Sequence, residues 1–397
     1  MTSSAKPARR QRPLVVDGND LLGAHRLLVD AITGTTHLVE AVHASILGWP
    51  RRIVGLSPKP DTGGIPGLAY GGVRGITRLA GNGIEQLLRW LPAATVEADR
   101  IPQREAVVAA LNGVLGDHLL ATGNPLALAA RLRMANRALV LERAALAASH
   151  PDAGSRLLVM VHGLCMNDLQ WQQGGHHHGN RLADELGFEV IHLHYNSGLS
   201  IAANGREFSA LLQQLADAWP VPIERIAIIA HSMGGLVSRA AIASAQADGS
   251  AWLARLDALA CLGTPHLGAP LERAGDLLQT LLGINAHSAP FKALGGLRSA
   301  GIQDLRHGSL RARHPPLPGH VRAFAVAAST QAPRIDGDRR GLRGDGLVPV
   351  ASAFGEHDDP ALGLAIPEEQ RLLVHRTGHI GLLSNTRVHV QLRDWLA

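Results

Sequence analysis

The stretch RIAIIAHSMGGLVSRAA, residues 225–241, constrains the fold of this chain more than any other segment. It begins as an apolar run typical of a strand that is buried on both faces, and it ends in a helical pattern. Between the two the chain reverses at Ser232, and so tight a turn holds that residue in a strained backbone conformation. Ala230 and Gly234, two positions away on each side, are small enough for this turn, and Gly235 adds room.

A serine on such a strand–turn–helix is typical of a catalytic nucleophile, for which the usual pattern is G-x-S-x-G. Here the first glycine is Ala230, which is one methyl group larger. The alternative is a chance A-x-S-x-G at an ordinary strand-to-helix turn, so the rest of the chain has to supply an acid and a base.

Candidates for both follow the serine, in the order acid and then histidine that this arrangement requires. A buried strand is predicted at residues 321–329, and the later segment GDGLVPVASA places Asp345 in a loop. Another short strand, residues 371–375, places His379 just beyond its end. In these positions His379 would take the serine proton, and Asp345 would fix the tautomer of the imidazole.

Each assignment has an alternative. Asp345 could simply cap a turn, as lone Asp-Gly pairs often do. His375 competes with His379 as the base, and we prefer His379 because His375 still belongs to the predicted strand.

Four motifs occur in one order along the chain: VHG at 161–163, AHSMGG at 230–235, GTPHLGAP at 263–270, and GDGLVP with GHIGLLSN near the C-terminus. With them, the chain from about Ser155 to Ala397 resembles α/β-hydrolases of the lipase and PGAP1-like group. The resemblance implies an α/β-hydrolase fold and a serine, aspartate and histidine triad, with GTPHLGAP shaping the pocket floor.

The resemblance also implies an oxyanion hole, because lipases that carry V-H-G after this strand use backbone amides there. The expected donors are the N–H groups of Leu164 and Met233. His162 is interpreted as a structural residue that holds the loop through a hydrogen bond. Support for the loop and the turn is expected from Gly163, His231, Gly234 and Gly235.

Apolar runs at LLVMVHG, EVIHLHY, RIAIIAH, LDALACLG, VRAFAVAAS and RLLVH alternate with helical patterns. This alternation predicts an α/β domain with a mostly parallel sheet and helices on both faces. Ser232, Asp345 and His379 then all follow the carboxyl ends of strands, where active sites of open α/β sheets lie.

The predicted organisation is a disordered basic tail over 1–13, a helical extension over 14–150 and the hydrolase domain over 155–397. An insertion at about 271–320 is interpreted as a cap or lid. Its apolar residues are expected either to line an acyl-binding cleft or to pack on the domain, and they are Leu278, Leu281, Leu282, Ile284 and Phe291. The helices before the domain are expected to pack against it, with a lipid surface as the alternative for their faces.

The formal charge is +5, but only 3% of the residues are aromatic and the arginines are scattered. Nucleic acid is therefore not an expected partner, whereas a peripheral contact with anionic lipid stays open. No run of apolar residues is long enough for a secretory signal or a transmembrane helix. Two cysteines, Cys165 and Cys261, give no disulfide framework, and we expect a cytoplasmic protein.

The run His176, His177 and His178 invites a metal hypothesis, because imidazole binds zinc readily. Adjacent residues point in different directions, however, and no carboxylate or cysteine stands at a ligand spacing. The run is interpreted as part of a loop near the oxyanion strand, and neither a metal nor another cofactor is expected.

These features together predict a serine hydrolase that cleaves carboxylic esters, of lipid-like substrates, through an acyl-enzyme on Ser232. The alternatives are an acyltransferase or thioesterase with the same residues, a polyester depolymerase, and a non-catalytic lipid-binding module. The oligomeric state cannot be read from the sequence.

Overall fold

A computed structural model describes residues 19–30, 102–268, 299–305, 316–333, 342–359 and 362–397. The predicted tail, most of the predicted N-terminal helices and the five apolar residues of the insertion lie outside these ranges. The chain divides into two compact units, which are Met1–Arg104 with Thr122–Leu126, and Glu105–Ala121 with Ala127–Ala397. In the first unit residues 19–30 are helical, and Arg104 forms an ion pair with Asp20 at 2.8 Å.

The described part of the second unit contains an eight-stranded sheet. Its strands are β1 (Arg131–Met134), β2 (Arg137–Ala138), β3 (Arg156–Val161), β4 (Glu189–His194), β5 (Arg225–His231), β6 (Leu256–Leu262), β7 (Arg322–Ser329) and β8 (Arg371–His375). The spatial order is β2-β1-β4-β3-β5-β6-β7-β8, in which β1 runs antiparallel to both neighbours and the other pairs are parallel.

A mostly parallel sheet of eight strands combined with helices is the architecture of an α/β-hydrolase fold, which confirms the predicted fold class. All six predicted apolar runs are strands. The hairpin of β1 and β2 was not predicted, so the sheet reaches into the region for which the sequence indicated mainly helices. The strand RLRM alternates arginine with apolar residues, but over only four positions, which is the shortest run that indicates a strand.

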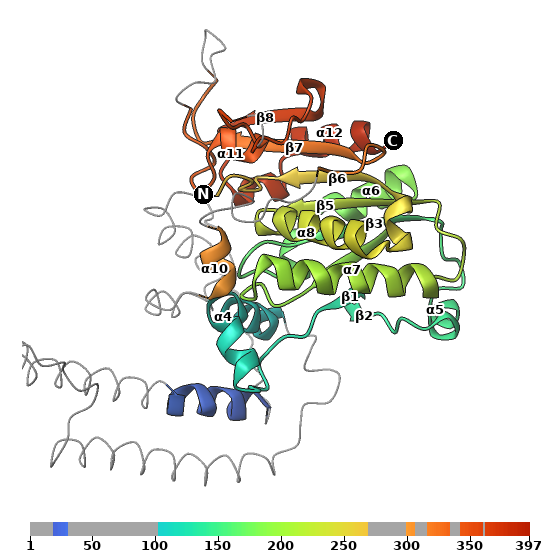
Figure 1. The fold of residues 1–397 in the computed structure, drawn as a ribbon, viewed down its shortest axis with the longest axis vertical. Helices are drawn as coiled ribbons and strands as arrows, with labels where there is room; N and C mark the ends of the chain where they lie inside the picture. The colour runs from blue at the N-terminus through green and yellow to red at the C-terminus, as the bar shows by residue number, and fades with distance from the viewer. Residues whose placement is uncertain (1–18, 31–101, 269–298, 306–315, 334–341, 360–361) are drawn as a thin grey trace, which may run out of the picture. The chain divides into compact units, whose positions relative to one another are not determined.

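Helices cover both faces of the sheet (Figure 1). The α-helices described in this part of the chain are α4 (Pro102–Ala121), α5 (Arg143–Ser149), α6 (His178–Leu186), α7 (Ile201–Ala218), α8 (Met233–Asp248), α10 (Ala300–Leu305), α11 (Val350–Phe354) and α12 (Thr386–Leu396). Single turns of 3-10 helix are η2 (Asp168–Trp171), η3 (Ala251–Arg255), η7 (Glu368–Gln370) and η8 (Ile380–Leu383). Among the described helices, none has the length and apolar character that crossing a membrane requires.

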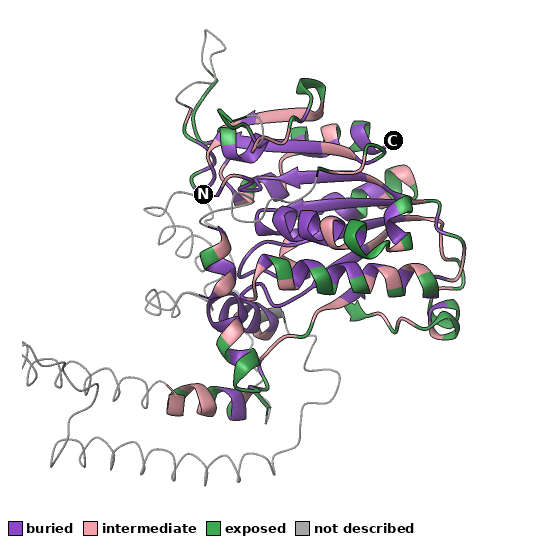
Figure 2. Ribbon diagram, in the orientation of Figure 1, coloured by how far each residue is buried: buried purple, intermediate pink, exposed green. Residues whose placement is uncertain are grey.

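Alternate residues of the central strands belong to one apolar cluster, into which α6 and α12 also insert side chains. Leu158 and Met160 of β3 and Ala227 and Ile229 of β5 point to this face, as the two-residue period of a strand dictates. The residues between them are buried under α8 on the other face (Figure 2). Burial on both faces explains why these strands read as continuous apolar runs.

The part of α4 from Glu105 belongs to the same compact unit as the sheet. Its Gly113 and Gly116 face Cys165 and Asn196, which follow β3 and β4, so closely that a β-carbon at either glycine would collide with them. This part of the predicted helical extension thus packs on the loops at the carboxyl ends of the strands.

Candidate active site

Ser232 lies between the last residue of β5 and the first residue of α8. Its backbone has φ 54° and ψ −124°, a conformation that L-residues rarely adopt. The residue is 2% exposed, and its amide donates to the carbonyl oxygen of Leu262 in β6 at 2.9 Å. The strain expected at this turn from the sequence is therefore present at the serine itself.

The glycines after Ser232 allow α8 to start against two neighbouring loops. A β-carbon at Gly234 would collide with the carbonyl oxygen of Val161, and one at Gly235 would collide with the side chain of Thr264. A β-carbon at Gly163 would lie 3.0 Å from the β-carbon of Ser232. The loops after β3 and β6 consequently meet at the serine.

Asp345 and His379 come together on the loops that follow β7 and β8. Oδ2 of Asp345 lies 2.7 Å from Nδ1 of His379, and the backbone N–H of His379 donates to the carbonyl oxygen of Asp345 at 3.0 Å. The other oxygen of Asp345 accepts from the amides of Leu347 and Val348 at 2.9 and 2.8 Å. Gly346 within this turn has φ 101°, which only glycine adopts readily.

The surroundings of Asp345 favour its ionised form. Burial raises the pKa of the carboxyl group, but the His379 ring and the two backbone amides outweigh burial, and the pKa is lowered from its usual value. The carboxylate accepts the Nδ1–H of His379, so the lone pair of that ring lies on Nε2. Nε2 of His379 is buried and has no hydrogen-bond partner among the described residues.

The serine and the Asp345–His379 pair meet around the end of β6. A β-carbon at Gly263 would lie 3.1 Å from Oδ2 of Asp345 and 3.2 Å from Cε1 of His379, and Leu262 before it accepts the amide of Ser232. The ring of His231 lies 4.6 Å from that of His379, with Nε2 at 3.2 Å from the His379 carbonyl oxygen. The neighbour of Ser232 thus contacts the histidine loop directly.

None of the other candidate residues that the structure describes takes part in the pair of Asp345 and His379. His375 is the last residue of β8 and is paired with Ser329. Asp336 and Asp338, which are other carboxylates before the histidine, lie outside the described residues, and Asp358 is exposed. The described residues therefore pair Asp345 with His379 and not with His375.

Of the two expected oxyanion donors, Leu164 lies in the loop after β3 and Met233 lies at the start of α8. Met233 is the first residue of α8, where an amide has no acceptor within the helix, and the hydrogen bonds of the described residues include no acceptor for the Leu164 amide. Cys165 next to it has φ 58°, and its amide donates to the Ser197 hydroxyl at 3.0 Å. The positive φ of Cys165 and its hydrogen bond to Ser197 fix the bend of the loop directly after Leu164.

His162 and Tyr195 stabilise the backbone of this loop through hydrogen bonds. Nδ1 of His162 lies 2.9 Å from the carbonyl oxygen of Gly163, and the ring stacks on Tyr195 with 4.4 Å between ring centres. The Tyr195 hydroxyl donates to the His162 carbonyl oxygen at 2.8 Å. Burial lowers the pKa of His162 to about 3, so its ring is neutral at pH 7.

Sequence reasoning missed Tyr195, Ser197 and Thr264 as supports of the site. Tyr195 ends the predicted strand EVIHLHY and Ser197 follows it, and their position at a carboxyl end was the available signal. Thr264 lies within GTPHLGAP, whose loop was expected near the nucleophile, although its contact with Gly235 depends on the close approach of α8.

Part of the domain that contains the sheet is similar to a known protein family. Residues 151–294 match the model of a family described as "Putative serine esterase (DUF676)". The matched segment carries Ser232 and the loop after β3, and it is similar to that family of serine esterases. A search of curated protein sequences finds no match.

Solved structures give a distant likeness. The mature lipase BlEst2 of Bacillus licheniformis has 17% identity and a TM-score of 0.41, over 62% of this chain and 94% of that chain. A Listeria innocua protein, the lin2722 product, has 12% identity and a TM-score of 0.38, over 61% and 94%. A malate-bound esterase from Thermogutta terrifontis has 16% identity and a TM-score of 0.37, over 62% and 90%. Such low identities and scores say nothing of this chain's substrate.

Proposed function

We propose that the chain is a serine hydrolase that cleaves carboxylic esters of lipid-like substrates through an acyl-enzyme on Ser232. The observation that carries this proposal is the buried pair of Asp345 and His379, joined at 2.7 Å. The lone pair of Nε2 in this pair has no hydrogen-bond partner among the described residues. The loop that carries His379 also contacts His231, the neighbour of the strained Ser232.

In the proposed reaction Oγ of Ser232 attacks the ester carbonyl carbon while Nε2 of His379 takes the hydroxyl proton. The carbonyl oxygen becomes an oxyanion, which the amides of Leu164 and Met233 stabilise. The C–O bond to the alcohol then breaks, and His379 returns the proton to the leaving oxygen. Water, activated by His379 in the same way, attacks the acyl-enzyme and releases the acid.

The electrostatics of the described residues suit this sequence of proton transfers. Burial lowers the pKa of His162 and of His231 to about 3, so neither ring carries charge at pH 7. Asp345 is ionised and stabilises the imidazolium that forms on His379 during attack. His162 and His231 are thus poor acceptors for the Ser232 proton.

Cys165 and Cys261 are free and buried, and burial raises the pKa of their thiols to about 12 and about 11. Thiols of this kind are unreactive packing groups and fit a reducing compartment. We propose a cytoplasmic location on this basis.

The proposal is tested by reaction with a fluorophosphonate, which phosphonylates an activated serine and loses fluoride. Intact mass after incubation should show one adduct on the wild type and none on Ser232→Ala, with circular dichroism confirming that both are folded. No adduct on folded wild type, with detergent present, would contradict the proposal and favour a non-catalytic lipid-binding module.

Turnover of esters of increasing acyl length then separates the remaining alternatives. A hydrolase should release acid at a rate that an added alcohol or thiol does not raise. Faster turnover with either acceptor would identify an acyltransferase. Release of soluble fragments from a polyester film would identify a depolymerase.

A further inference from the structure

The histidine run before α6 does not behave as three equivalent residues. His177 is extended, with φ −144° and ψ 111°, and its Nδ1 accepts the amide of Asn180 as the N-cap of α6. Because side chains of an extended segment alternate, His176 and His178 point to the opposite side from His177. Nε2 of His176 lies 2.8 Å from Nδ1 of His178.

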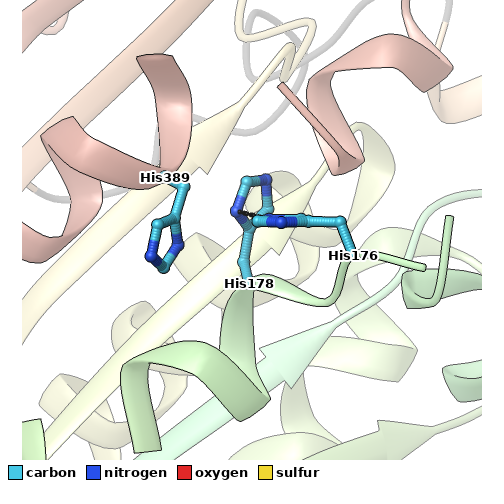
Figure 3. A group of neighbouring side chains, drawn as sticks. All are labelled: His176, His178 and His389. Atoms are coloured by element: carbon cyan, nitrogen blue, oxygen red, sulfur yellow. Dashed lines mark hydrogen bonds between the residues drawn. The ribbon is translucent and has the colours of Figure 1, made fainter. Parts of the chain in front are cut away.

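A third histidine from a distant part of the chain completes a group. His389 of α12 lies beside the pair, with ring centres 5.2 Å from His176 and 5.8 Å from His178. One ring nitrogen from each of the three residues lies within 4.8 Å of the others. Figure 3 shows the three rings converging from the loop before α6, the start of α6 and the C-terminal helix.

The outer nitrogens of two rings are held by acceptors. Nε2 of His178 lies 2.9 Å from the carbonyl oxygen of Leu382, and Nε2 of His389 lies 3.1 and 3.2 Å from the two carboxylate oxygens of Glu185. Each contact places the ring proton on Nε2 and leaves the lone pair on Nδ1. Metal-bound histidines are usually held in this manner, by a carbonyl or a carboxylate on the other nitrogen.

One of these lone pairs accepts no hydrogen bond from the described residues. Nδ1 of His389 is buried and has no hydrogen-bond partner among the described residues, and the residue is 5% exposed. Leaving a buried polar atom unpaired is unfavourable, because the atom has lost its hydrogen bonds to water. A ligand that accepts this lone pair would remove the cost.

A second buried group, Glu105, Asp168 and His194, provides a contrast. There the guanidinium of Arg133 lies 2.8 Å from Glu105 and 2.9 Å from Asp168 and forms an ion pair with each carboxylate. The carboxylates hold an internal cation, so the group needs no metal. Within the described residues, no hydrogen bond joins the histidine group to a cationic side chain.

We propose that His176, His178 and His389 bind one divalent metal ion of the zinc class. Three imidazoles suit zinc, and a water molecule would complete four-coordinate geometry. At Zn–N distances of about 2.0–2.1 Å, ligand nitrogens stand roughly 3.3 Å apart, so the close pair has to separate by about 0.5 Å. Binding through Nε2 of His176 moves the proton of this ring from Nε2 to Nδ1.

The proposed metal ion would connect segments that lie next to the candidate active site. It links the loop before α6 to α12, and His178 also holds the carbonyl oxygen of Leu382 in η8. His379 directly precedes η8. The ion would therefore stabilise the turn that carries the proposed base without touching Ser232, so its binding does not depend on the proposed esterase activity.

Zinc binding is measured on the full chain after removal of any affinity tag and treatment with a chelator. Wild type should take up one zinc ion per chain, and Co²⁺ should give the visible absorption of a four-coordinate site. Tm should rise by roughly 5 °C or more when zinc is about 100-fold above Kd. Absence of stoichiometric uptake by folded wild type would overturn the proposal.

Two single variants test the ligands, and a third provides the control. His389→Gln and His176→Gln should each weaken zinc binding at least 10-fold and lose the rise in Tm. The matched control is His357→Gln, which changes an exposed histidine and should bind as wild type does. If both ligand variants bind zinc as tightly as wild type, the proposal is wrong, and circular dichroism of each variant verifies its fold.

Discussion

Two buried histidines lie at the two ends of η8, His379 before its first turn and His178 against Leu382, and an acceptor holds one ring nitrogen of each. At one end Asp345 holds Nδ1 of His379, and at the other Leu382 holds Nε2 of His178. In both cases an acceptor fixes the tautomer and leaves a lone pair on the other nitrogen. What differs is the neighbour: His379 belongs to the loop beside Ser232, whereas His178 faces His176. The chemistry of a fixed imidazole thus depends on what stands opposite it.

The largest expected effect is a loss of ester turnover that leaves zinc binding unchanged. Ser232→Ala and His379→Ala should each lower kcat/KM for a short-chain ester by roughly 10⁶-fold, because nucleophile and base act as a unit. Zinc uptake by either variant should equal that of wild type. The measurement is ester turnover beside zinc titration on the same samples.

The double variant makes the comparison sharper. Because both groups serve one step, Ser232→Ala with His379→Ala should lose little more activity than either single variant. Additive losses would show that the two residues act in separate steps and would remove the triad assignment.

Asp345→Asn should have the next largest effect. The amide cannot stabilise the imidazolium and favours the wrong tautomer of His379, so kcat should fall by about 10⁴-fold. Asp358→Asn, a change at an exposed carboxylate, is the control and should leave kcat unchanged. Near-normal activity of Asp345→Asn would mean that another carboxylate is the acid.

The proposed catalytic residues could be predicted from the sequence, whereas the histidine group could not, because the two sets are distributed differently along the chain. Ser232, Asp345 and His379 each follow an apolar run, and the order of the runs predicts that their carboxyl ends share one edge of the sheet. No such rule connects His176 and His178 to His389. That contact depends on how α12 packs against α6, which is a matter of tertiary packing and leaves no local pattern.

Arg133 is a second example of what the sequence could not show. It reads as one charged residue in a short polar segment, yet it is 2% exposed and pairs with two buried carboxylates. Its burial follows from the antiparallel pairing of β1 with β4, and β1 was too short to predict.

A smaller effect is expected from the carboxylate that holds His389. Glu185→Gln keeps the size of the side chain but weakens its hold on Nε2–H, and zinc affinity should fall by about 10–100-fold. Competition with a chromogenic chelator measures the change. Ester turnover at saturating zinc should stay at the wild-type level.

The control is Asp184→Asn, which removes one negative charge from the adjacent exposed position of α6. It should leave zinc affinity within a factor of about two, since it holds no ring nitrogen. Equal losses in the two variants would indicate that only the net charge near the cluster matters.

The smallest expected effect is the pH dependence of stability at the Asp345 end. The pKa of Asp345 is lowered in the folded protein, so its stabilising contribution is complete above the unfolded value of about 3.9. It is lost as pH falls through the folded pKa. The difference in unfolding free energy between wild type and Asp345→Asn should be constant down to about pH 5 and then shrink, by at most about 1.4 kcal/mol per pH unit. Urea unfolding at several pH values measures it, and Ser232→Ala, which keeps the pair, should follow wild type. A difference that widens at acid pH would show that folding favours the protonated carboxyl, and the hydrogen bond to His379 would then not be that of an ionised acid holding a base.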